Sequence, residues 1–289
     1  MSIKASELIL NPDGSVYHLN LRPEHLAKTI ITVGDPDRVG KITEHFDAIE
    51  FQTQKREFHT QTGTYKGKRI SVISTGIGTD NIDIVLNELD ALVNIDLEKR
   101  EIKDQLTTLE IIRVGTSGSI QKEIPIDSFL ISGYAAGFDS LLHFYKNENI
   151  QNHKISEALI KHTHWSPLKS KPYIVKCNDE LLQKFSSDRT IKGFTATNVG
   201  FYGPQGRVLR LPVQDDDLNE KLASFNYDNM PITNLEMETA GIYCLSALLG
   251  HKALSLNAII ANRATGEFSK DPTSLVNNLI TYTLDKLVE

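Results

Sequence analysis

The sequence contains little that could form a disulfide framework or a metal centre. Its two cysteines, Cys177 and Cys244, fall in unrelated segments without a metal-binding spacing. We therefore expect both to be reduced thiols in the core. His162 and His164 lie two residues apart, but there is no third candidate ligand nearby, so the sequence predicts no metal site.

Long apolar runs and blocks of positive charge are also missing. No apolar run approaches the ~20 residues of a transmembrane helix, and residues 1–7 lack the apolar core of a signal peptide. The 31 basic and 37 acidic residues give a net charge of −6 without a basic cluster. The sequence therefore predicts neither a nucleic-acid partner nor a membrane partner, and it favours a cytoplasmic location.

The remaining pattern is that of a folded α/β protein. Apolar strand patterns such as residues 29–33 alternate with amphipathic helix patterns, of which residues 80–94 are the clearest and residues 273–287 the last. This alternation is typical of a three-layer α/β/α domain. No internal repeat or linker interrupts the chain, so we expect one domain over residues 1–289. The charged segment 96–110 has two interpretations, an extension of the preceding helix or an insertion.

An arginine precedes a glycine-punctuated turn in one predicted strand. Residues 111–114 (Ile-Ile-Arg-Val) are typical of a strand buried on both faces, and residues 115–118 (Gly-Thr-Ser-Gly) are typical of a turn at its end. Ligands of open α/β sheets bind at the carboxyl ends of strands. There Arg113 would offer a fork for an oxyanion and Thr116 a hydroxyl group. The alternative is an ordinary strand and turn whose arginine reaches solvent.

A second strand exit has the geometry of an anion site. Strand 29–33 runs into Gly34 and Pro36, and helical spacing follows, so free amides and the positive end of a helix point the same way. Arg38 in the first helical turn opposes the helix dipole unless a bound anion compensates its charge. This misfit favours an anion site over a plain strand–helix turn.

Two later loops could contact a ligand. Residues 201–207 (Phe-Tyr-Gly-Pro-Gln-Gly-Arg) combine aromatic rings with an amide and a guanidinium, which suits a flat polar ring, although an ordinary surface loop has the same composition. Residues 234–241 enter a helix, where acidic residues often only cap the first turn. Because Glu236 and Glu238 are two residues apart, they cannot share a helical face, and at most one would face a given ligand.

Other polar residues have a structural interpretation by pattern alone. His18 lies among alternating apolar residues, and Arg56 and Glu57 have the pattern of surface charges on an edge strand. Residues 74–78 (Ser-Thr-Gly-Ile-Gly) form another glycine-rich strand exit after a hairpin turn at residues 66–68. Such a pair of glycines is weak evidence for a site.

Together these segments resemble the nucleoside phosphorylase-I family over nearly the whole chain. The matching segments are 34–38 (Gly-Asp-Pro-Asp-Arg), 56–58 (Arg-Glu-Phe), 74–78 (Ser-Thr-Gly-Ile-Gly), 113–116 (Arg-Val-Gly-Thr), 201–207 (Phe-Tyr-Gly-Pro-Gln-Gly-Arg) and 235–238 (Leu-Glu-Met-Glu). The resemblance implies a single α/β domain around a mixed, partly barrel-like sheet. It also implies that phosphate splits a nucleoside into free base and ribose 1-phosphate, and within the family the similarity is to members that cleave uridine.

The resemblance assigns a role to each candidate residue. The phosphate site would consist of Gly34, Arg38, Arg56, Arg113 and Thr116. The ribose contacts would be His18, Glu236, Met237 and Glu238. The base contacts would be Phe201, Gln205, Arg207 and Arg263. The catalytic residues among these would be Arg38, Arg113, Gln205 and Arg207, which hold the attacking phosphate and the departing base.

The resemblance also bears on assembly and bound ions. Arg56 and His18 would serve the site of a neighbouring subunit, so the working unit is at least a homodimer, with a hexamer left open. Phosphate is a co-substrate, and no cofactor is implied. Some relatives hold a monovalent cation with Glu57 and a serine. Asn81 takes that serine's place here, which leaves the ion open.

Three alternatives differ from this interpretation in the residues they require. A purine nucleoside phosphorylase would share the phosphate and ribose residues but would carry an acid near Asn262. A nucleosidase would attack with water and would have no use for Arg38 and Arg113. A non-catalytic nucleoside-binding protein would not need the complete set of arginines. The sequence therefore favours phosphorolysis of uridine.

Overall fold

The computed structural model describes residues 2–147 and 149–289. The strands are β1 (Thr29–Val33), β2 (Ala48–Lys55), β3 (Phe58–Tyr65), β4 (Lys68–Ser74), β5 (Ile95–Asp96), β6 (Glu101–Ile102), β7 (Glu110–Ser119), β8 (Phe129–Gly137), β9 (Tyr173–Lys176), β10 (Thr190–Thr197), β11 (Asn226–Tyr227), β12 (Met230–Glu236), β13 (Lys252–Asn262) and β14 (Glu267–Phe268). The helices are α1 (Asp37–Thr43), α2 (Thr79–Asn94), α3 (His153–Thr163), α4 (Asp179–Phe185), α5 (Leu218–Ser224), α6 (Thr239–Leu249) and α7 (Pro272–Val288), with 3-10 turns at Pro23–His25, Leu141–Phe144 and Gly203–Gln205. Met1 and Glu148, which the predicted domain range 1–289 includes, lie outside the described residues.

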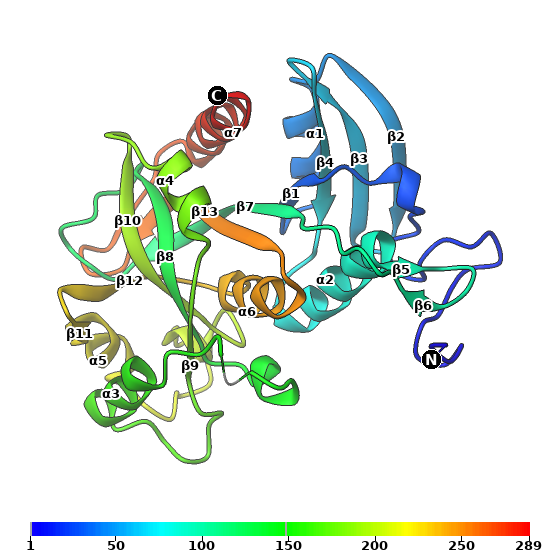
Figure 1. Ribbon diagram of the computed structural model, residues 1–289. Coiled ribbons are helices and arrows are strands. Elements are labelled where there is room, and N and C mark those ends of the chain that lie inside the picture. The colour runs from blue at the N-terminus through cyan, green and yellow to red at the C-terminus, as the bar shows by residue number, and fades with distance from the viewer. Residues whose placement is uncertain (1, 148) are drawn as a thin grey trace.

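One mixed sheet of 12 strands organises the molecule. Its order is β11-β12-β10-β8-β13-β7-β1-β4-β3-β2, and β14 and β9 are attached to β13 and β8. The sheet is partly closed, because β12 also pairs with the end of β7, where Asn234 lies opposite Ser119. Figure 1 shows β2, β3 and β4 as an open extension on one side and β8 and β10 on the other, with β7 and β13 crossing between them. The predicted mixed, partly barrel-like sheet is thereby confirmed.

Helices cover the central strands from two sides. Helices α2 and α6 contact one another, and α6 also contacts β13 and β8. Helix α7 contacts β13 and β7, and in Figure 1 it lies across β13 from α6. The strands between these layers are buried on both faces: every residue of β1 is buried, as the continuous apolar pattern of a parallel strand predicts. The helix predicted over residues 80–94 is α2, and its apolar face lies in the core.

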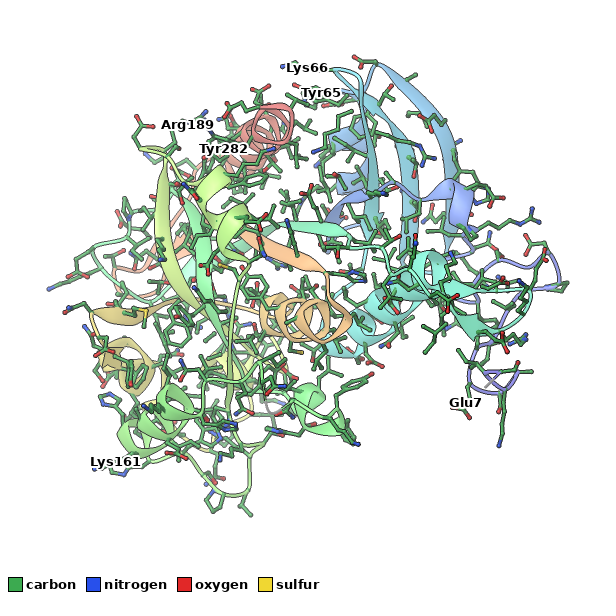
Figure 2. The ribbon with its side chains drawn as sticks, viewed as in Figure 1. Glu7, Tyr65, Lys66, Lys161, Arg189 and Tyr282 are labelled. Atoms are coloured by element: carbon green, nitrogen blue, oxygen red, sulfur yellow. The ribbon has the colours of Figure 1, made fainter. Side chains whose placement is uncertain are left out.

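The β3–β4 hairpin is attached to the C-terminal helix. Tyr65 donates a hydrogen bond from its hydroxyl to Asp285 Oδ1 at 3.0 Å, and Lys66 Nζ lies 2.8 Å from the same oxygen. Figure 2 shows Tyr65 and Lys66 at the tip of this hairpin, on the same side of the molecule as α7. This exposed ion pair contributes little stability by itself, but it joins the open extension of the sheet to the helix beside the barrel.

The structure decides between two interpretations and corrects two predictions about local structure. Residues 96–110 do not extend α2, which ends at Asn94; they form an insertion in which β6 pairs with β5 as a separate two-stranded sheet. Residues 115–118 are not a turn, because β7 continues through them to Ser119, paired with β13. Arg56 is not on a strand: it lies in the β2–β3 turn with a φ of 56°, a left-handed conformation that strand pairing does not allow. In the described part of the chain, no helix is both long and apolar enough to cross a membrane.

Candidate active site

A cavity of about 480 Å³ lies where β1, β7 and β12 reach their carboxyl ends. Most of the residues predicted for the site line it: Gly34, Arg38, Arg113, Thr116, Phe201, Gln205, Arg207, Glu236, Met237 and Glu238. They come from strand ends and loops that are far apart in sequence. The sheet brings them together because the parallel pairing of β1 with β7 places Thr32 opposite Arg113, and the closure of β12 onto β7 brings in the two glutamates.

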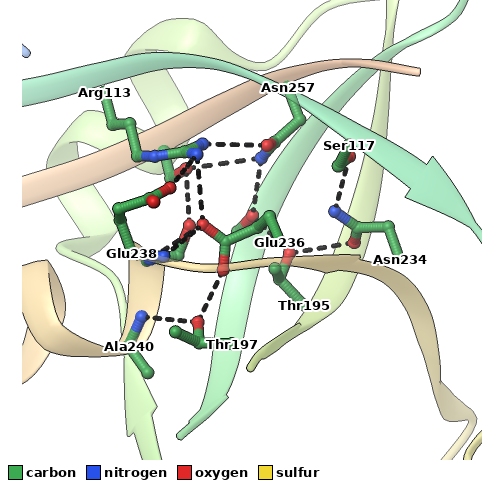
Figure 3. A network of polar contacts seen from close by, with 12 residues as sticks. Arg113, Ser117, Thr195, Thr197, Asn234, Glu236, Glu238, Ala240 and Asn257 are labelled. Carbon is green, nitrogen blue, oxygen red and sulfur yellow. Dashed lines mark hydrogen bonds and ion pairs between the residues drawn. The ribbon is translucent and has the colours of Figure 1, made fainter. Parts of the chain in front are cut away.

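Arg113 is the buried centre of a polar network inside the barrel. Its Nη2 lies 2.6 Å from Glu238 Oε2 and 3.2 Å from Glu236 Oε2, and its Nη1 donates to Asn257 Oδ1 at 3.0 Å. Figure 3 shows Glu236, Glu238 and Asn257 around the guanidinium. Arg113 is only 6% exposed, so it does not reach solvent as the plain strand interpretation required.

The glycine two residues after Arg113 makes room for this arginine. A Cβ atom on Gly115 would lie 2.0 Å from Arg113 Nη1, closer than any side chain tolerates. Residues 113 and 115 project from the same face of β7, and the guanidinium folds back over the backbone at 115. Gly115 is therefore required by the arginine itself, in addition to any close approach of a ligand.

The two glutamates both contact Arg113, although the helical spacing argument separates them. Glu236 ends β12 and Glu238 is the N-cap of α6, so neither lies within the helix and the helical spacing argument does not apply. Glu236 Oε2 accepts the backbone N–H groups of Glu238 and Thr239, each at 2.9 Å, which caps α6. Its Oε1 accepts from the Thr197 hydroxyl at 2.6 Å. Glu238 Oε1 accepts the backbone N–H of Gly78 at 2.9 Å.

Burial and the neighbouring charges together shift the pKa values of the ionisable groups in this network. Burial alone would lower the pKa of Arg113, but the carboxylates of Glu236 and Glu238 overcome this effect and raise it. Burial raises the pKa of Glu238, and the guanidinium of Arg113 opposes that shift. Each charge therefore depends on the others for its stability in the interior. Breaking a buried ion pair of this kind typically costs roughly 3–5 kcal/mol.

Arg38 lines the cavity as a second guanidinium, and no carboxylate of residues 2–147 and 149–289 forms an ion pair with it. Its Nη1 donates to the backbone carbonyl of Val114 at 3.2 Å. Burial, and then the positive charge of Arg113, lower the pKa of Arg38. Two guanidinium groups that repel one another across a cavity favour the binding of an anion between them.

The 201–207 loop contributes an amide and a guanidinium that are bonded to each other. Gln205 is buried, and its Oε1 accepts from Arg207 Nη1 at 2.7 Å. Arg207 also donates to the carbonyl of Phe201 at 2.6 Å, and its guanidinium carbon lies 3.8 Å from the centre of the Phe201 ring. Because arginine can only donate, this contact fixes the orientation of the Gln205 amide.

Three predicted site residues do not line the cavity. Arg263 donates to the backbone carbonyls of Gln205 and Gly206, so in this structure it supports the loop. Arg56 is exposed in the β2–β3 turn. His18 lies in a turn and is bonded to Glu88 of α2 at 2.7 Å. The structure therefore brings together the residues predicted to come from one chain, except Arg263, while the two predicted to serve a neighbour lie elsewhere.

Sequence reasoning missed the polar residues that support Arg113. Asn257 is fully buried in the middle of β13, and its amide also donates to Ser132 and Ser255. Asn234 links Ser117 to the neighbouring strands, as Figure 3 shows. The available signal was the presence of asparagine within otherwise apolar strands, where an amide needs buried partners.

Comparison with known proteins identifies the family. The model of the phosphorylase superfamily matches residues 28–288. The chain belongs to this superfamily. A uridine phosphorylase from Thermococcus kodakarensis is 30% identical over 264 residues, which are 89% of this chain and 81% of the relative. A purine nucleoside phosphorylase of the DeoD type from Bacillus subtilis is 28% identical over 86% of this chain and 88% of the relative.

A solved structure of a phosphorylase shares the fold over almost its entire length. A Trypanosoma brucei nucleoside phosphorylase, described as showing uridine phosphorylase activity, covers 97% of this chain and 99% of its own. The TM-score is 0.87 at 30% identity. The resemblance to the nucleoside phosphorylase-I family and the predicted fold of this phosphorylase are therefore confirmed.

Two glycines of β7 provide a matched test of the buried arginine. Gly115→Ala should displace the Arg113 guanidinium and destabilise the protein by at least ~1–3 kcal/mol, the usual cost of overpacking. Gly118→Ala should be tolerated, because its Cβ would come no closer than 3.7 Å to Arg263 Cγ. Urea unfolding of both variants measures the difference. Equal stability of the two would contradict the assigned role of Gly115.

Proposed function

We propose that this phosphorylase cleaves uridine with phosphate, giving uracil and ribose 1-phosphate. The observation that carries the proposal is the layout of the cavity. Arg38 and Arg113 line it together with the buried carboxylate of Glu238 and with the amide and guanidinium of the 201–207 loop. These groups could bind a phosphate dianion, the hydroxyl groups of a ribose and the polar edge of a base.

The two arginines are suited to hold the attacking phosphate. Cleavage of the N-glycosidic bond develops positive charge on the ribose and negative charge on the departing base. A dianion bound by Arg38 and Arg113 would lie beside the developing positive charge and would supply the attacking oxygen. The backbone at Gly34 and the hydroxyl of Thr116, two residues that also line the cavity, would complete this phosphate site.

The carboxylate of Glu238 is the group best placed to accept ribose hydroxyls. One of its oxygens accepts from Gly78 and the other from Arg113, and each retains a lone pair. Glu236 is more fully used by the protein: its Oε2 faces Arg113 and two backbone N–H groups, and its Oε1 accepts the Thr197 hydroxyl. Glu236 would therefore assist the ribose site by holding Arg113 and the start of α6, and the half-buried Met237 would pack against the sugar.

The base loop matches a uracil edge. With its Oε1 turned to Arg207, Gln205 can donate from Nε2 to a carbonyl, and Oε1 retains a lone pair for the ring N–H. Arg207 can donate to the second carbonyl and share the negative charge of the leaving uracil. Asn262 is fully used by the protein: it donates to Gln121 and Ile124 and accepts from two backbone amides. It is an amide and not an acid, which disfavours protonation of a purine there.

The minimal active unit is proposed to be a homodimer, with a hexamer built from dimers left open. His18 and Arg56 do not line the cavity of their own chain. They would instead approach the site of a neighbouring subunit, His18 at the 5′-hydroxyl and Arg56 at the phosphate.

Cleavage of uridine should require phosphate. Arg38→Ala should raise the KM for phosphate by roughly 10–100-fold, the effect of losing a charge-assisted hydrogen bond, while the KM for uridine changes little. Lys41→Ala, in the same short helix but exposed, is the control. Uracil release is followed by absorbance with and without phosphate. An unchanged rate in phosphate-free buffer would rule out phosphorolysis.

Uridine should be strongly preferred over cytidine and inosine. Cytidine presents an amino group to donors and lacks the ring N–H, and a buried site that leaves its groups unpaired can discriminate by up to roughly 10⁴–10⁵. Gln205→Ala and Arg207→Ala should each reduce kcat/KM for uridine strongly while the phosphate KM stays nearly constant. Arg210→Ala, exposed in the same region, is the control. Faster cleavage of inosine by the wild type would show that the assignment is wrong.

Mixed subunits should test the shared site. Arg56→Ala damages the neighbour's phosphate site, and Glu238→Gln damages the chain's own ribose site, so both homo-oligomers should have low activity. Dissociation and reassembly of a mixture should restore activity, because one site of each hybrid dimer is then intact. A mixture of Arg38→Ala and Glu238→Gln should not recover, since each site keeps a defect of its own chain. Fully active monomers in a sizing experiment would refute the shared site.

A further inference from the structure

The turn that carries His18 is organised by a single carboxylate of α2. Glu88 accepts three hydrogen bonds from it: the backbone N–H of His18 at 2.9 Å, the backbone N–H of Leu19 at 2.8 Å and the ring Nδ1 of His18 at 2.7 Å. The side chains of His18 and Glu88 are only 25% and 15% exposed. Three donors on one partly buried carboxylate define both the backbone of this turn and the orientation of the imidazole.

This arrangement determines which ring nitrogen is available. A carboxylate only accepts, so Nδ1 of His18 carries the proton that it donates to Glu88. In the neutral ring Nε2 is then an acceptor, and among residues 2–147 and 149–289 no protein group is hydrogen-bonded to it. The same division of labour, in which a carboxylate orients a histidine whose other nitrogen acts on the substrate, occurs in enzymes of unrelated fold.

The turn is also docked against the strand that leads to Arg56. Lys55, the last residue of β2, donates to the carbonyl of Tyr17 at 2.5 Å, and its Nζ lies 4.3 Å from the centre of the Tyr17 ring. Asn20 donates to the Thr53 hydroxyl at 3.0 Å. His18 therefore belongs to the same rigid surface as Arg56, the other residue proposed to serve the neighbouring site.

We propose that Glu88 is a positioning residue for the ribose end of the neighbouring site. It holds the imidazole through Nδ1 and leaves Nε2 to accept a hydrogen bond from the 5′-hydroxyl of a nucleoside bound in the adjacent subunit. Glu88 touches no substrate itself and does not line the cavity of its own chain. The inference rests on the proposed function, in which His18 contacts that hydroxyl.

The 5′-hydroxyl itself provides the test. Glu88→Gln keeps the size of the side chain but turns an NH₂ group toward one of three donors, so the histidine loses its fixed orientation. The ratio of kcat/KM for uridine to kcat/KM for 5′-deoxyuridine should fall by about tenfold, the value of one hydrogen bond to the substrate. His18→Ala should lower the ratio equally, and the double variant should lower it no further, as expected for residues that act as one unit.

The ratio separates positioning from a merely structural role. Because both substrates are measured on the same preparation, a smaller fraction of folded enzyme cancels from it. Glu98→Gln, an exposed acid beyond the end of α2, should leave the ratio unchanged. Equal losses on both substrates, or no loss in Glu88→Gln, would overturn the inference while leaving the proposed function intact. A wild-type protein that cleaves no nucleoside with phosphate would overturn both.

Discussion

The structure depends on keeping a positively charged arginine inside a β-barrel. A guanidinium without partners would be too costly in the interior, so the fold must surround Arg113 with acceptors. Glu236 and Glu238 come from the end of β12, and Asn257 comes from the adjacent strand β13. Gly115 is needed for the same reason, since any side chain there would collide with the guanidinium. One buried charge thus explains Gly115 in β7, Asn257 in β13 and the two glutamates where β12 ends.

The same network links the barrel to the start of helix α6. Glu236 accepts the first free N–H groups of α6 while it also contacts Arg113. Glu238, the N-cap residue, connects the guanidinium to Gly78 at the start of α2. Loss of one carboxylate would therefore disturb two helices and the arginine together. This coupling places the proposed ribose contact on a rigid support, which a precisely oriented reaction requires.

The contrast between the two arginines explains how one cavity can be stable and still bind an anion. Arg113 has its charge compensated by the protein, whereas Arg38 contacts a backbone carbonyl and lies near another positive charge. The base loop is held in a similar way. Arg207 orients Gln205 and is itself stacked on Phe201. Residues that are proposed to contact substrate are thus held by contacts that leave part of their hydrogen-bonding capacity free.

The sequence by itself determined the features that arise from local pattern and from motifs. Strand β1, the hairpin at residues 66–68 and helix α2 follow from periodicity and turn chemistry. The motif segments also contain most of the residues that line one cavity. Only the tertiary structure decided which strands and residues meet when the sheet closes. β7 continues past Gly115 because β13 pairs with it, and Glu236 and Glu238 both reach Arg113 because β12 ends beside β7. Local propensity carries no information about such long-range pairing, and the contacts that close the barrel exist only once the chain has folded.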